Sequence, residues 1–219
     1  MKDHKIILGT PRSGSNFVTK WYANEYSEYT PLSPNQGHEH FEPDHPGWPN
    51  LDDAKGIDKE TQLRIDALEN KTLWKVLAGP YMSELIFDYI SNMPVVLVKR
   101  KDLLGQFLSY GIGITTDKWV NYDKTIKSNN GLTSNQTFYY KKEWFDEMVY
   151  RLKDLEKRQK TLNIEKLVWF EDIPNFKING KLPIRQNDFS NETKLNWLTN
   201  SNEFMDWFST FTNSFVLQE

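Results

Sequence analysis

The most informative segment of this sequence is Gly9-Thr10-Pro11-Arg12-Ser13-Gly14-Ser15-Asn16. Residues 5–9 before it form a largely apolar run typical of a short buried strand, and residues 17–26 after it have the spacing of an amphipathic helix. A loop between a strand and a helix start binds phosphate well, because backbone N–H groups and the positive end of the helix face the ligand. Arg12 adds a planar cation with several donors to this loop.

The loop differs from the phosphate-binding loop of nucleoside triphosphatases at two positions. Gly9 and Gly14 have the spacing of that loop, but Ser15 and Asn16 replace the Lys and the Ser or Thr that should follow. The lysine that reaches the β- and γ-phosphates is therefore missing, and so is the hydroxyl that ligates Mg²⁺. The segment suits a phosphate group without the triphosphate–Mg²⁺ apparatus. The alternative is a structural turn whose glycines only allow tight packing, which the combination of residue types at 11–15 disfavours.

The rest of the chain alternates predicted strands with predicted helices. This pattern predicts an α/β fold, a three-layer sandwich with a central parallel sheet flanked by helices, in a single domain over residues 1–219. Residues 27–56, which contain five prolines, and residues 115–135 are predicted to be irregular. Further strands are predicted at 72–78, 94–99 and 166–170, and helices at 58–70 (capped by Asp58), from Pro80 to 92, and at 102–112, 138–162, 191–200 and 202–210.

Composition excludes several classes of function. The 219 residues include 27 Lys and Arg against 30 Asp and Glu, a net charge of -3, which argues against nucleic acid as a partner. There is no cysteine, so disulfides, thiolate catalysis and cysteine-ligated metals are excluded. No apolar run approaches the length of a membrane span. We therefore expect a soluble, cytoplasmic protein, whose oligomeric state the sequence does not indicate.

The segment Pro11–Phe17 resembles the 5′-phosphosulfate loop of the sulfotransferases, often written P-[KR]-[ST]-G-[ST]. That family transfers a sulfuryl group from 3′-phosphoadenosine 5′-phosphosulfate (PAPS) to a hydroxyl or amine, releases 3′-phosphoadenosine 5′-phosphate (PAP), and needs no metal. The resemblance implies a P-loop NTPase-like sulfotransferase fold. It also implies that the loop binds the cofactor through Pro11, Arg12, Ser13, Gly14, Ser15 and Asn16.

A second segment, Val98–Tyr110, is similar to the family's 3′-phosphate signature, an Arg at a strand end followed by a Ser on the next helix. The spacing is one residue longer than the commonest one and resembles the branch typified by bacterial trehalose sulfotransferases. Nine helical residues would place Arg100 and Ser109 on opposite faces, so Arg100 must precede the helix. The alternative is a solvated basic cluster. The residues that match are Arg100, Lys101 (in place of a second Arg), Gln106 and Ser109.

The catalytic base is less clearly indicated. Lys75 matches the Lys of a Lys-x-His signature in cytosolic sulfotransferases, but Leu77 replaces the His. Alternatively, Lys75 is a strand lysine with its head in solvent. Glu39 matches the proposed base of the trehalose-type branch and would stay ionised near Arg12, although it reads equally well as a charged loop residue. His38 and His40 are alternative bases.

Two weaker interpretations concern the loops. Arg185 lies in a segment that resembles the family's late nucleotide-contacting loop. The His and acidic residues at 38–45 fit no established metal-ligand spacing, so no metal site is predicted.

The resemblance implies a PAPS-dependent sulfotransferase that acts on a small-molecule or carbohydrate acceptor by in-line displacement, with Glu39, Arg12 and Lys75 as catalytic residues. Two other interpretations stay open. The chain is a small-molecule kinase with an altered loop, or it is a non-catalytic nucleotide-binding protein on the same fold.

Overall fold

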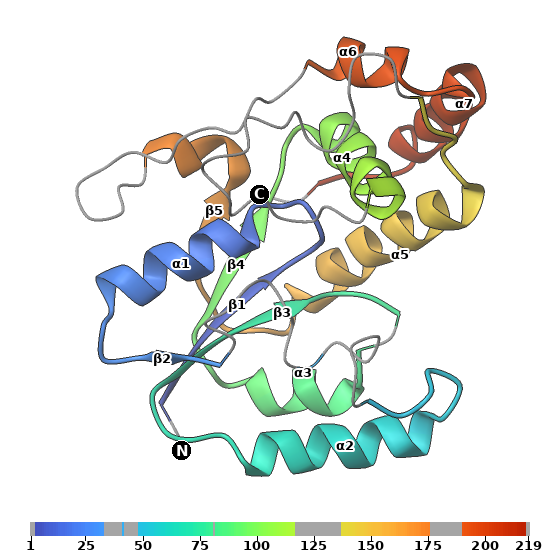
Figure 1. Ribbon diagram of the computed structural model, residues 1–219. Coiled ribbons are helices and arrows are strands. Elements are labelled where there is room, and N and C mark those ends of the chain that lie inside the picture. The colour runs from blue at the N-terminus through green and yellow to red at the C-terminus, as the bar shows by residue number, and fades with distance from the viewer. Residues whose placement is uncertain are drawn as a thin grey trace.

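The computed structural model describes residues 3–32, 41, 48–80, 82–116, 137–175 and 190–217. In these residues five parallel strands form one sheet in the order β2-β3-β1-β4-β5 (Figure 1). The strands are β1 (His4–Gly9), β2 (Thr30–Pro31), β3 (Thr72–Leu77), β4 (Val95–Lys99) and β5 (Ile164–Trp169). The helices are α1 (Ser15–Glu25), α2 (Ala54–Asp66), α3 (Glu84–Ile90), α4 (Leu103–Thr116), α5 (Lys142–Arg158), the 3₁₀ helix η1 (Phe170–Asn175), α6 (Asn191–Asn196) and α7 (Ser201–Thr212).

The central strands are buried on both faces. Ile6 and Leu8 of β1 belong to a cluster that contains side chains of α2, α3 and α5. Ile7, between them in sequence, belongs to a second cluster with Val18 and Tyr22 of α1. Because successive strand side chains point to opposite faces, the two clusters are two helix layers on either side of the sheet. This arrangement confirms the predicted α/β fold with a parallel sheet flanked by helices.

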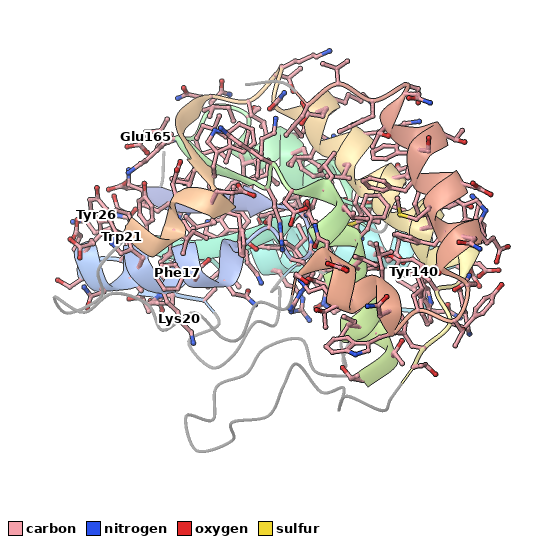
Figure 2. All side chains as sticks on the ribbon, turned by 90° about the horizontal axis from the view of Figure 1, so that it is seen from above. Phe17, Lys20, Trp21, Tyr26, Tyr140 and Glu165 are labelled. Carbon is pink, nitrogen blue, oxygen red and sulfur yellow. The ribbon has the colours of Figure 1, made fainter. Side chains whose placement is uncertain are left out.

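A third cluster of buried side chains joins helices α4, α5 and α7. It is rich in aromatic rings, and Phe107 of α4 packs against Phe145 of α5 and Phe211 of α7. The buried hydroxyl of Tyr140 donates to the Phe107 carbonyl at 3.1 Å. Figure 2 shows Tyr140 among these helices, well separated from Phe17, Trp21 and Tyr26 along α1. The aromatic cluster therefore packs α4 against α5 and α7.

The direction in which successive strands are added to the sheet reverses at β1. The chain passes from β1 to β2 and β3 on one side and then returns to β4 on the other side. In open parallel sheets, ligands bind beyond the carboxyl ends of the strands at such a reversal. The loop that follows β1 lies at this end of the sheet, below helices α4, α6 and α7 in Figure 1.

Several predicted boundaries are wrong. The helix predicted at 58–70 begins at Ala54, and its cap is Asp53, which accepts from the Gly56 N–H at 2.9 Å, rather than Asp58. No helix begins at Pro80; α3 begins at Glu84, capped by Ser83. Both errors arise because several nearby residues offer a cap and only packing selects among them.

Strand β2 was not predicted, because residues 27–56 were expected to be irregular. It has only two residues at the edge of the sheet, too few to show a period in the sequence. The long charged helix predicted at 138–162 spans Lys142–Arg158, and the helix predicted at 102–112 begins at Leu103 and extends to Thr116. Among the residues that the structure describes, no helix is long and apolar enough to cross a membrane.

Candidate functional site

The loop between β1 and α1 has the conformation that its glycines allow. Gly14 has a φ of 91° and Arg12 a φ of 62°, both in the left-handed region. A side chain at Gly14 would also run into Ile173 and come within 2.9 Å of the Phe170 ring. Glycine is thus required at position 14 for backbone conformation and for space. The turn is closed by the Ser13 N–H, which donates to the Thr10 carbonyl at 3.2 Å.

Among the described residues, no side chain accepts a hydrogen bond from the first amide groups of α1 in the way that a helix cap does. Gly14 is the N-cap residue, and no side chain caps this end of the helix within the described part of the chain. The hydroxyl of Ser13 is fully buried, and it also has no hydrogen-bond partner among the described residues. A buried polar atom without a partner is costly, so such groups call for an explanation such as a ligand. Together the two features favour an anion at this loop.

Helix α4 is tied directly to this loop by Gln106. The side-chain amide of Gln106 is buried and donates to the Thr10 hydroxyl and to the Pro11 carbonyl, both at 2.8 Å. A carbonyl only accepts, so the contact with Pro11 fixes the amide nitrogen on the loop side. Ser109 follows three residues later and therefore lies on the same face of α4. The structure thus brings the two segments singled out in the sequence together.

Arg100 lies directly after β4, before helix α4, as its spacing from Ser109 requires. It is only 5% exposed, which contradicts the alternative of a solvated basic cluster. Its guanidinium pairs with Asp102 at 3.0 Å and stacks 4.3 Å from the centre of the Phe170 ring. Its Nε is buried with no hydrogen-bond partner among the described residues. The Arg100 side chain therefore has a donor still to satisfy.

Asp102 organises the start of α4. Its carboxylate accepts from the Gly105 N–H and from the Asn191 side chain, both at 2.9 Å, in addition to the Arg100 contact. Partial burial alone would raise the pKa of this carboxyl group, but the hydrogen bonds and the charge of Arg100 outweigh burial and lower the pKa below its usual value. Asp102 is thus a carboxylate in neutral solution and balances part of the Arg100 charge.

Glu171 of η1 also contacts this region. Its carboxylate accepts from the N–H groups of Lys101 and Asp102 at 3.1–3.2 Å. The Lys101 side chain is exposed, and its ammonium lies 4.9 Å from the centre of the Trp169 ring on β5. Protein carboxylates therefore occupy amide donors at the start of α4, whereas no side chain of the described residues caps α1.

Lys75 joins the other side of the loop. It lies on β3, is 8% exposed, and donates to the side-chain oxygen of Asn16 in the first turn of α1. The alternative that its head lies in solvent is therefore wrong. Leu77, where the family has a histidine, is buried at the end of β3. The structure thus places a cation beside the loop but no imidazole at that position.

Four of the predicted site residues lie outside the described residues: Glu39, His38, His40 and Arg185. Their roles stay predictions. Within the described residues, no group of three or more His, Asp or Glu side chains is arranged to hold a metal ion.

Sequence reasoning missed the partners that hold the site together. They are Thr10 and Asp102, which lie inside the two quoted segments but were given no role there, and Asn191 and Glu171, which carry no recognisable motif. It also missed Arg151 of α5, which is buried against Gly79 just beyond β3 and donates to the Ala78 carbonyl at 3.2 Å. The only signal for Arg151 was its place on a charged helix, where a solvent-facing side chain is the default.

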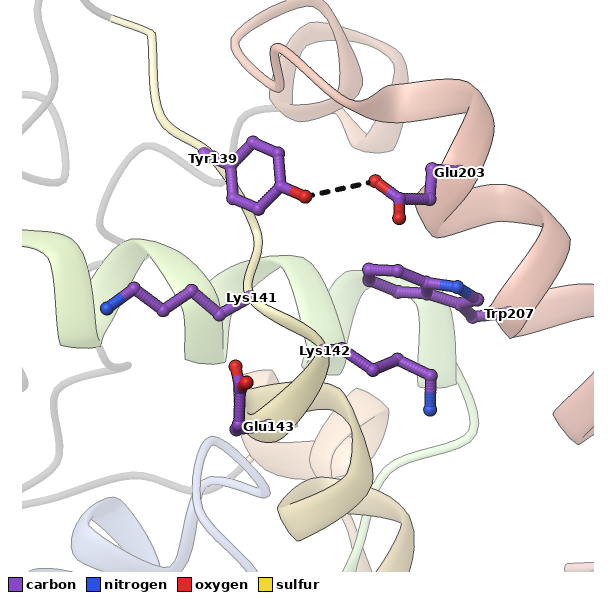
Figure 3. A pocket seen from close by; sticks show the side chains of 6 residues that line it. All are labelled: Tyr139, Lys141, Lys142, Glu143, Glu203 and Trp207. Carbon is purple, nitrogen blue, oxygen red and sulfur yellow. Dashed lines mark hydrogen bonds between the residues drawn. The ribbon is translucent and has the colours of Figure 1, made fainter.

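A hollow with a volume of about 480 Å³ lies on the surface between the start of α5 and α7 (Figure 3). Two of its polar groups contact each other, since the Tyr139 hydroxyl donates to Glu203 at 3.2 Å, and Lys142 pairs with Asp146 outside the lining. It contains none of the predicted site residues. The lining residues are Tyr139, Lys141, Lys142, Glu143, Glu203 and Trp207. We therefore place the candidate site at the loop after β1 rather than here.

A scan against protein-family models finds no match for this chain, and a search of curated proteins finds no significant relative. The function is therefore argued from the geometry of the site and from the motif resemblance.

Proposed function

We propose that this chain is a sulfotransferase that binds PAPS and transfers its sulfuryl group to a hydroxyl or amine of a small-molecule or carbohydrate acceptor. One observation carries the proposal. Among the described residues the phosphate-type loop has no side chain that caps its helix and no partner for its buried Ser13 hydroxyl, and Gln106 hydrogen-bonds this loop to the helix that follows Arg100. Two anion-binding elements at one edge of the sheet match a donor that carries one phosphate on each side of its ribose.

The residues fit such a donor in a specific way. The loop amides, the Ser13 hydroxyl and Arg12 would bind the 5′-phosphosulfate, because they surround the positive end of α1. Arg100 would bind the 3′-phosphate through a charge-assisted hydrogen bond from its unpartnered Nε. Ser109, on the loop-facing side of α4, would add a neutral donor. Lys101, which lies against Trp169, is the weakest of the proposed contacts.

The reaction would be an in-line displacement at sulfur. The acceptor oxygen forms a bond to sulfur while the bond between sulfur and the bridging oxygen of the 5′-phosphate breaks, and PAP leaves. The acceptor proton passes to a base, for which Glu39 is the proposed residue and His38 and His40 are alternatives. Charge builds up on the leaving phosphate, where Lys75 and Arg12 would stabilise it. No metal is needed, since these side chains and the loop amides supply the positive charge.

The proposal is tested by calorimetric titration of the protein with PAP, 5′-AMP and ATP–Mg²⁺. We expect PAP to bind well, and Arg100→Ala to weaken it roughly ten- to hundredfold, as expected for loss of hydrogen bonds to a charged group. Binding of 5′-AMP should change little, because it lacks the 3′-phosphate. Arg64→Ala on α2 removes another cation, one paired with Glu60, and serves as the control.

Other outcomes would redirect the assignment. Binding of ATP–Mg²⁺ without PAP would contradict the proposal and favour a kinase. PAP binding without transfer to any member of a broad acceptor panel would favour a non-catalytic nucleotide-binding protein.

A further inference from the structure

Two contacts connect the glycine loop to the segment that carries Arg100. The first is made by the Gln106 side-chain amide, which donates one hydrogen bond to the Thr10 hydroxyl and one to the Pro11 carbonyl. The second is the Phe170 ring, which lies close against Gly14 on one side and 4.3 Å from the Arg100 guanidinium on the other. The two proposed phosphate-binding elements are therefore braced against each other by side chains that bind neither phosphate.

The Gln106 contact is fixed in geometry. Gln106 is completely buried, and its side-chain oxygen has no hydrogen-bond partner among the described residues. The side chain is thus held there at a cost, since an unpartnered buried oxygen is unfavourable. A leucine or methionine would fill the same space without the unpartnered oxygen, but it would also leave the Pro11 carbonyl without this donor, so the amide serves to hold the loop against α4.

We propose that Gln106 is a positioning residue that sets the distance between the loop after β1 and the helix α4, and thereby selects a ligand with two phosphates over one with a single phosphate. This inference rests on the proposed function. A ligand held by both elements gains affinity only if they are already at the right separation, because rearrangement would consume binding energy. A ligand held by the loop alone does not depend on the separation.

The test uses Gln106→Met, Thr10→Val and the double variant, each titrated with PAP and with 5′-AMP. Gln106→Met keeps the length of the side chain and removes both donors, and Thr10→Val removes the hydroxyl that accepts one of them. We expect Gln106→Met to weaken PAP about tenfold and 5′-AMP about twofold or less, as loss of one to two net hydrogen bonds in positioning would give. The double variant should be little worse than Gln106→Met, because the two residues share one contact.

A matched control separates positioning from general loss of stability. Thr72→Val removes a buried hydroxyl at the opposite end of the sheet, where Thr72 contacts His4 and the Glu69 carbonyl. It should lower the melting temperature and leave the ratio of PAP to 5′-AMP affinity unchanged.

The results that would overturn the inference are distinct from those that would overturn the proposed function. Equal weakening of PAP and 5′-AMP, no weakening of either, or full additivity in the double variant would contradict a positioning role for Gln106. Failure of the unaltered protein to bind PAP would remove the proposed function, and the inference with it.

Discussion

Replacing Ser13 by alanine separates stability from binding at the candidate site. The Ser13 hydroxyl is fully buried and has no hydrogen-bond partner in the part of the chain described. Leaving such a group unpaired costs about 1–3 kcal/mol relative to a paired one. Ser13→Ala removes the unpaired group and leaves only a gap of one oxygen atom. We therefore expect the free energy of unfolding to stay the same or to rise by up to about 2 kcal/mol.

The same substitution should weaken the ligand. Under the proposed function the hydroxyl donates to a charged phosphate, and a hydrogen bond to a charged group contributes about 1.5–3 kcal/mol, or roughly ten- to hundredfold in affinity. The two effects are measured by urea unfolding, followed by the fluorescence of the eight tryptophans, and by calorimetric titration with PAP.

Ser83→Ala is the matched control. Ser83 is also buried, but its hydroxyl caps α3 by accepting from the Leu85 N–H and donates to Asp58 at 2.7 Å. Its loss should cost about 1–2 kcal/mol of stability and leave PAP binding unchanged. If Ser13→Ala destabilised the protein as much as Ser83→Ala does, the Ser13 hydroxyl would be paired within the protein. If Ser13→Ala left PAP affinity unchanged, the loop would not use this donor.

Three further predictions concern the elements around the site. Gly14→Ala should destabilise the protein by roughly 2–5 kcal/mol, the cost of a left-handed φ added to the cost of the clash with Ile173 and Phe170. Urea unfolding measures the loss, and Ile173→Val in the same chain should recover part of it. Lys99→Met should lower the free energy of unfolding by about 3–5 kcal/mol, because it leaves Glu156, 2.7 Å from Lys99 in the native pair, buried without that cation. Adding Glu156→Leu should recover most of this loss, and a double variant as unstable as Lys99→Met would contradict the reasoning. Because the pKa of Asp102 is lower in the folded protein than its unfolded value of 3.8, its carboxylate stabilises the fold above that pH, and the contribution is lost as pH falls through the folded pKa. The unfolding free energy of the unaltered protein should therefore exceed that of Asp102→Asn by a constant amount near neutrality and by less below about pH 4. A difference that persists in acid would refute the assignment.

The parts of the site that the sequence predicted are those set by local patterns. The strand before Gly9 and the helix after Ser15 follow from a short apolar run and a helical period. The sequence singled out Gly14 only by its spacing from Gly9, and its left-handed φ is a finding of the structure. The position of Arg100 before α4 followed from the family resemblance, which gives Arg100 and Ser109 one shared site, together with helix geometry.

The parts that could not be predicted depend on which segments become neighbours. The Gln106–Thr10 contact joins residues 96 positions apart, and no local period indicates it. Lys75 contacts Asn16 only because β3 lies beside β1 in the sheet, and the sequence of one strand does not indicate which strands will pair with it. Its predicted alternative, a head in solvent, failed for that reason. The predicted cap of α2 was wrong for another reason, because the sequence offers several residues that could cap this helix and the structure uses Asp53.

The contrast between the two helix starts gives the site its selectivity under the proposed function. At α1 no side chain in the described ranges caps the amide groups, so a phosphate there competes with water. At the start of α4 the carboxylates of Asp102 and Glu171 already bind the amides, and Asp102 also pairs with Arg100. An anion at this second place would accept from the Arg100 Nε, which the contact with Asp102 leaves unoccupied, and would lie close to the negative charge of Asp102. A phosphate with nearly two negative charges and three acceptor oxygens forms a strong hydrogen bond to this donor, whereas a ribose hydroxyl forms a weaker one. Asp102→Asn removes a charge that repels the 3′-phosphate, so it should strengthen PAP binding more than 5′-AMP binding and widen the difference in affinity between them.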